Sequence, residues 1–94
     1  MRRVLVILSG EIDGPVLRSR CGALESAGAI ALCYQLPDNA GLEQGLTVQR
    51  RLTQLLRATL GPAAEAVPIF IATDRDGERT ADLADAWGAT EVDR

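Results

Sequence analysis

Three short, mostly apolar segments alternate along this chain with segments of helical periodicity, and this alternation constrains its fold more than any other feature. The apolar segments are Val4–Leu8, Ala29–Leu36 and Pro68–Thr73. Strands of a parallel sheet have this unbroken apolar character because helices cover both faces of the sheet. The sequence therefore predicts an α/β domain built on parallel strands.

Helices are predicted between the strands, because apolar residues recur there three and four positions apart. The three helical segments are Pro15–Gly28, Val48–Leu60 and Glu78–Trp87. Residues 37–45 are rich in Gly, Asp, Asn and Pro and are predicted to form a loop. A fourth strand is expected to begin near Thr90, which gives the order β-α-β-α-β-α-β.

The chain of 94 residues is long enough for one domain, which we expect to span residues 1–94. The predicted architecture has three layers, α/β/α, around a parallel sheet of three to four strands. Right-handed crossovers bring the carboxyl ends of the strands to one edge of the sheet, where ligand sites are expected. The predicted core consists of ten aliphatic residues: Leu5, Ile7, Leu24, Leu32, Leu52, Leu55, Leu56, Ile69, Ile71 and Leu83.

The composition excludes several chemistries. All ten basic residues are arginine, and the chain contains neither lysine nor histidine. A histidine base, a histidine metal ligand, a Schiff-base lysine and a Walker phosphate loop are therefore impossible. Cys21 and Cys33 lack a metal-binding spacing and are predicted to be small buried apolar residues.

Charge and hydropathy narrow the expected partners. Residues 59–94 contain eight acidic residues and three arginines, which disfavours nucleic-acid binding because phosphate contacts supply most of its affinity. No apolar run reaches transmembrane length, and no signal peptide is evident, so no membrane partner and a cytoplasmic location are expected.

Polar residues follow the predicted strands at the edge where ligand sites are expected. They are Ser9, Glu11, Asp13, Asp38, Asp74 and Asp76. Carboxylates of this kind can hold Mg²⁺, and they also serve as turn and helix-capping residues. The pattern leaves both interpretations open. Ser9 has no histidine or lysine partner in the sequence, so a nucleophilic serine is not expected.

The chain resembles a universal stress protein domain over residues 4–36 and 60–92. The resemblance lies in the "AGA" junction before the second strand, in "LGP" followed by "VPIFIA", and in the helix "ERTADLADAWGA". It implies the strand order 3-2-1, with any fourth strand beside strand 1. It further implies a non-catalytic stress-response or regulatory role, with a homodimer or a protein as partner.

The same resemblance implies a nucleotide site formed by Ser9, Gly10, Asp13, Gly14 and Leu36, with the base held against the ends of the first two strands. Ser9 stands where nucleotide-binding members carry an acidic residue. Their glycine-rich phosphate loop, G-x-x-G-x₉-G-[ST], has no counterpart in the sequence. We therefore expect ATP binding to be weak or absent.

The segments "LSGEID" and "ATDRDGER" also resemble Toprim domains, which are metal-dependent modules of nucleic-acid-processing enzymes. Asp74 and Asp76 match the Asp-x-Asp pair of that family. Two positions differ, because Ser9 stands in place of the family's glutamate and Arg79 stands in place of a later glycine. Glu11 could take the place of that glutamate only if the alignment is shifted by two residues. This alternative implies a Mg²⁺ site at Glu11, Asp74 and Asp76, and it requires strand 3 beside strand 1. An unrelated Rossmann-type interaction or regulatory module is a third interpretation.

Overall fold

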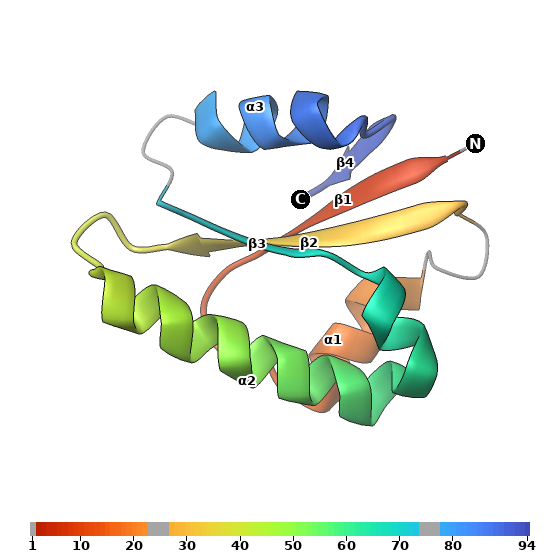
Figure 1. Ribbon diagram of the computed structural model, residues 1–94, viewed down its shortest axis with the longest axis horizontal. Helices are drawn as coiled ribbons and strands as arrows, with labels where there is room; N and C mark the ends of the chain where they lie inside the picture. The colour runs from red at the N-terminus through yellow and green to blue at the C-terminus, as the bar shows by residue number, and fades with distance from the viewer. Residues whose placement is uncertain (1, 23–26, 74–77) are drawn as a thin grey trace.

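The structure, a computed structural model, describes residues 2–22, 27–73 and 78–94 (Figure 1). Four parallel strands form one sheet in the order β3-β2-β1-β4. The elements are β1 (Arg3–Leu8), α1 (Gly14–Arg20), β2 (Ala29–Leu36), α2 (Leu42–Leu60), the 3-10 helix η2 (Gly61–Ala66), β3 (Ile69–Thr73), α3 (Glu78–Trp87) and β4 (Glu91–Asp93). The predicted α/β class and strand order are confirmed.

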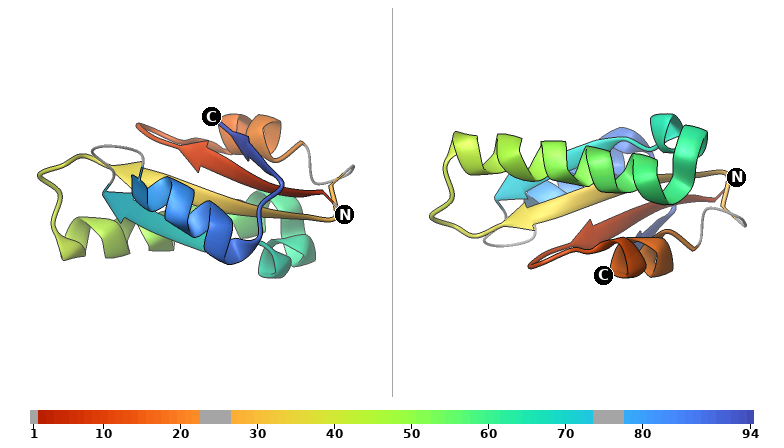
Figure 2. Two further views of the ribbon diagram at one scale, coloured as in Figure 1. Left: turned by 90° about the horizontal axis from the view of Figure 1, so that it is seen from above. Right: turned by 90° about the horizontal axis from the view of Figure 1, so that it is seen from below.

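The helices form two layers, one on each face of the sheet. α1 and α2 lie on one face and α3 on the other, as the opposite views of Figure 2 show. Alternate residues of β1 enter the two cores, as expected for a strand covered on both faces. Val4 and Val6 pack in the core beneath α1 and α2, whereas Leu5 and Ile7 pack in the core beneath α3.

The predicted core is largely confirmed. Five of its residues are buried: Leu5, Ile7, Leu32, Leu52 and Leu56. Four more are partly buried against the two cores: Leu55, Ile69, Ile71 and Leu83. Leu24 lies outside the described residues. Ile69 and Ile71 are less buried because β3 forms one edge of the sheet. Pro68, just before β3, fits an edge because proline cannot donate to a further strand.

Two helices have different bounds from those predicted. α2 begins at Leu42 instead of Val48, because Gly41 takes the N-cap position and Gly45 is buried within the helix. A Cβ on Gly45 would lie 3.4 Å from Cδ1 of Leu36, an ordinary van der Waals contact, so this position of the helix faces the sheet. α1 ends at Arg20, because the backbone N–H of Cys21 bonds to carbonyls of the preceding turn and closes the helix.

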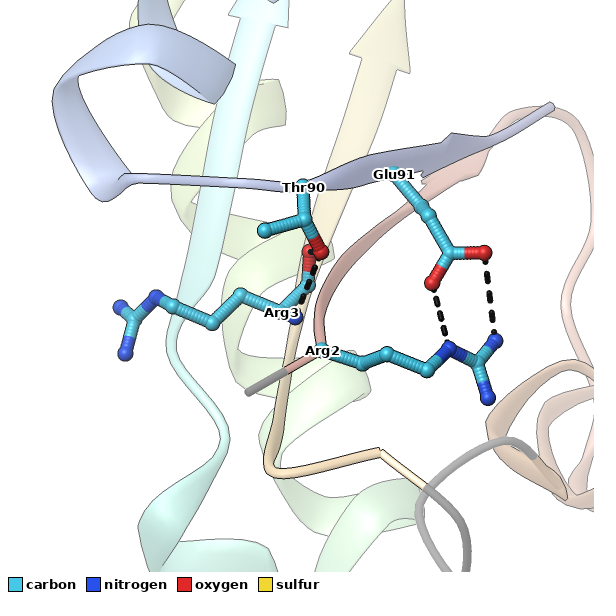
Figure 3. Close-up of polar contacts among 4 residues, drawn as sticks. All are labelled: Arg2, Arg3, Thr90 and Glu91. Carbon is cyan, nitrogen blue, oxygen red and sulfur yellow. Dashed lines mark hydrogen bonds and ion pairs between the residues drawn. The ribbon is translucent and has the colours of Figure 1, made fainter.

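β4 is joined to the amino end of β1 by backbone and side-chain contacts (Figure 3). The backbone N–H of Arg3 donates to Oγ1 of Thr90 at 2.9 Å, and the backbone N–H of Thr90 donates to the Arg3 carbonyl at 2.8 Å. The guanidinium of Arg2 forms an ion pair with Glu91. These contacts hold the short edge strand against β1.

The turn between α3 and β4 is fixed by Arg3. Its guanidinium donates to the Trp87 carbonyl, at 2.8 Å from Nη2, and lies 4.2 Å from the centroid of the Trp87 ring. Gly88 follows with φ of 80°, a left-handed conformation that favours glycine. A cation at the carboxyl end of a helix also interacts favourably with the helix dipole.

Stability should depend on pH through the Arg2–Glu91 pair. The hydrogen bond from Arg2 lowers the pKa of the Glu91 carboxyl, and the same bond raises the pKa of Arg2. Because the folded-state pKa of Glu91 is depressed, the stabilisation is present above the ordinary glutamate value of about 4.3 and is lost as the pH falls through the folded-state pKa.

Glu91→Gln should therefore lower the free energy of unfolding slightly at neutral pH and leave it unchanged in acid. Both side chains are about half exposed, which keeps the effect small. Urea unfolding of the parent and the variant at several pH values measures the difference. A gap between the two proteins that persists below the titration of Glu91 would contradict the assignment.

Candidate functional site

A cavity of about 190 Å³ opens at the carboxyl ends of β1 and β2. The loop after β1 forms one side and α2 forms the other. Seven residues line it: Gly10, Glu11, Ile12, Tyr34, Val48, Arg51 and Leu52. The position agrees with the edge of the sheet at which the sequence predicts a ligand site.

The loop that forms one wall of the cavity is fixed by three contacts. The Tyr34 hydroxyl donates to the Gly10 carbonyl, which anchors the loop to β2. Gly10 has φ of 69°, so a side chain at this position would be strained. The Ile12 side chain is buried in the core, and Asp13 caps α1 by accepting from the backbone N–H of Val16 at 2.9 Å. The cavity wall is therefore preformed.

The lining combines apolar walls with two opposite charges. Ile12, Val48 and Leu52 supply aliphatic surface, and Tyr34 supplies an aromatic ring. Glu11 and Arg51 line the same cavity and are exposed. In the part of the chain that the structure describes, these two side chains form no ion pair with each other or with a third residue. The cavity can therefore hold an apolar ring with a polar substituent directed to solvent.

The residues predicted for a nucleotide site are only partly brought together. Gly10 lines the cavity, while Ser9 beside it is exposed and Asp13 and Gly14 form the start of α1. Leu36 lines a separate hollow of about 260 Å³ at the carboxyl ends of β2 and β3, together with Leu42, Leu46, Ile71 and Arg79.

Sequence reasoning missed Tyr34, Val48, Arg51 and Leu52 as cavity residues. Tyr34 is the only tyrosine and interrupts the aliphatic run of β2, which is a weak signal of a special position. Arg51 belongs to the arginine-rich exposed side of α2, and nothing in the sequence distinguishes it from Arg50. The packing angle of α2 against the sheet decides which of them reaches the cavity.

The crevice between β1 and β4, where the strand order reverses, is occupied by an arginine. Rossmann-type sheets often bind ligands at such a reversal. Nη2 of Arg20 donates there to the Ile7 carbonyl at 2.8 Å and to the Asp93 carbonyl at 3.1 Å. Its Nε lies 3.9 Å from Oδ2 of Asp93. The cavity consequently opens on the other side of β1, toward β2.

The strand order separates β1 and β3, the two strands that precede the residues predicted for a Mg²⁺ site. β3 pairs with β2 from Leu32↔Ile69 to Leu36↔Thr73, so β2 lies between the ends of β1 and β3. At about 4.8 Å per strand, these ends are roughly 10 Å apart. Glu11 is exposed beside the cavity, and Asp74 and Asp76 lie outside the described residues. Within residues 2–22, 27–73 and 78–94, no group of three potential metal ligands occurs. β3 therefore does not lie beside β1, as the Toprim interpretation requires.

Both cysteines are buried, as the sequence predicts, and no disulfide joins them. Cys21 packs beneath α1 and α2, and Cys33 packs on the opposite face of the sheet. Burial raises the pKa of the Cys21 thiol, and the nearby Arg20 charge opposes this only in part. The thiolate that nucleophilic chemistry needs is disfavoured at Cys21.

No protein-family model, curated protein or solved structure matches this chain. Among the described residues, no helix has both the length and the apolar character needed to cross a membrane. The function is therefore inferred from the residues of the chain and from their arrangement.

Proposed function

We propose that this chain is a non-catalytic, universal-stress-like α/β domain with a stress-response or regulatory role, and that its cavity holds the base of a nucleotide. One observation carries the proposal: a sheet of order β3-β2-β1-β4 has a preformed, largely apolar cavity where β1 and β2 end. This is the position at which the resemblance places the base.

The size of the cavity favours a ring over a whole nucleotide. Pockets that enclose a drug-sized ligand have volumes of about 300–1,000 Å³. The cavity here is smaller, at about 190 Å³, and suits one ring system with its substituents outside. The Tyr34 ring and the aliphatic walls supply the stacking and apolar contacts that a base prefers.

Affinity for ATP should be low, and hydrolysis should not accompany binding. The described lining of the cavity contains one cation, Arg51, so phosphate contacts contribute little. It also contains no histidine or lysine that could act as a general base or hold a transferring phosphate. Ligand binding is therefore proposed as a regulatory signal.

A protein partner or a second copy of the chain is part of the proposed role. Leu42 is 81% exposed and Leu46 is 45% exposed on the first turns of α2, and both side chains offer apolar surface to such a partner. A cytoplasmic location and the absence of a nucleic-acid partner belong to the same proposal. The acidic residues after position 59 support the latter.

Calorimetric titration of adenosine into the protein tests the proposed site. Val48→Trp fills the cavity and should weaken adenosine binding by at least about tenfold, a loss of roughly 1.4 kcal/mol. Gln54→Trp, an exposed position on the same helix, is the matched control and should bind like the parent. Melting curves establish that both variants are folded.

Two results would refute the proposed function. Equal adenosine affinity in the parent and Val48→Trp would place the site elsewhere. ATP turnover by clean protein would show that the domain is catalytic.

A further inference from the structure

The loop between β1 and α1 carries two carboxylates, Glu11 and Asp13, where a phosphate site would need positive charge. The first helical position after Gly14 is Pro15, which has no backbone N–H. The next two donors are already used, since Val16 N–H bonds to the Asp13 carboxylate and Leu17 N–H bonds to the Asp13 carbonyl. The Gly10 carbonyl is engaged by Tyr34. The N–H groups of Val16 and Leu17 are therefore not available to an incoming anion.

Two side chains of opposite charge line the cavity and are exposed to solvent. Arg51 supplies one positive charge from α2, and Glu11 supplies one negative charge from the loop. A single phosphate can approach Arg51, but each further phosphate adds negative charge that no second lining cation balances. Glu11 and the capping Asp13 make the loop side of the opening unfavourable for a polyphosphate.

From these contacts we infer that the cavity selects its ligand by phosphate number and takes a nucleoside or nucleoside monophosphate in preference to a triphosphate. Glu11 sets the preference by repelling additional phosphates, and Arg51 accepts the first one. This inference rests on the proposed function, because it assumes that the base occupies the cavity. It assigns the domain a ligand whose level rises when nucleoside triphosphates are consumed.

The inference predicts an order of dissociation constants for adenosine, AMP, ADP and ATP, measured by calorimetry at low ionic strength without divalent cations. AMP should bind within about threefold of adenosine, and ATP should bind about five- to tenfold more weakly. Raising the salt concentration should reduce the gap, because exposed charges are screened.

Glu11→Gln should reduce the ratio of the ATP and adenosine dissociation constants to about one to two, since it removes the repelling charge and keeps the side-chain size. Arg51→Gln should weaken AMP relative to adenosine by about threefold to fivefold. Glu65→Gln is the matched control: it changes the net charge equally, but it lies on η2 at the opposite end of the sheet. That variant should keep the parent order.

The outcomes separate this inference from the proposed function. ATP binding as tightly as adenosine, or a ratio unchanged by Glu11→Gln, overturns the inference while adenosine binding still supports the proposed function. Failure of adenosine to bind overturns both. The expected order, with its loss in Glu11→Gln and its retention in Glu65→Gln, supports both.

Discussion

Leu56→Ala is expected to lower the free energy of unfolding by about 2–5 kcal/mol, and the same change at Leu55 should cost clearly less. Leu56 is only 1% exposed and packs with Leu52 and Leu17 in the core between the sheet and the helices α1 and α2. Its neighbour Leu55 only borders that core and is partly buried. Truncation at Leu56 therefore leaves a cavity that the surrounding side chains cannot fill.

The Leu56→Ala loss is large compared with the total stability of a small domain, about 5–15 kcal/mol. For a chain of this length, each kcal/mol shifts the midpoint of thermal unfolding by about 4–8 °C. Urea unfolding of the two variants gives the free energies, and calorimetry gives the midpoints. Equal losses at positions 55 and 56 would mean that α2 is rotated about its axis relative to the sheet.

The strands could be predicted because the responsible signals are local. Val4–Leu8 and Ala29–Leu36 are apolar on both faces, which only a covered parallel strand requires. Pro68 marks β3 as an edge. The order β3-β2-β1-β4 also required the resemblance to universal stress proteins, since apolar runs do not specify which strands are neighbours.

Helix ends were harder to predict because they depend on packing. The glycines at 41 and 45 are typical of a loop, yet Gly41 caps α2 and Gly45 lies inside it. Gly45 lies in the helix despite the low helix propensity of glycine, and it faces Leu36 and Ile71 of the sheet. Such a contact cannot be deduced from the segment alone.

The cavity lies at the edge of the sheet where the sequence predicts a ligand site, but few of its lining residues were predicted. The carboxyl end of β1 follows from topology, which placed Gly10 and Glu11 beside the cavity. The contribution of α2 depends on how that helix crosses the sheet, so Val48 and Arg51 were missed. Leu36 was assigned to the same site, but its side chain packs toward Gly45 and a different hollow.

The second large effect is expected at Thr80, which is fully buried on α3. Its Oγ1 accepts a hydrogen bond from Nε2 of Gln35 on β2 at 3.1 Å. Thr80→Val keeps the shape of the side chain and removes the hydroxyl, so a partly buried amide loses a partner. The expected loss in the free energy of unfolding is about 1–3 kcal/mol, measured by urea unfolding.

A double-mutant cycle separates the hydrogen bond from packing. The double variant Gln35→Leu/Thr80→Val removes both polar partners. Its loss in the free energy of unfolding should be smaller than the sum of the two single losses, by about 0.5–3 kcal/mol. The reason is that each single change removes the contact but leaves one of its two polar groups in place, whereas the double change removes both groups. Strictly additive losses would show that the 3.1 Å contact contributes no coupling between β2 and α3. Coupling within the expected range would identify this bond as a specific polar contact that positions α3 over its face of the sheet.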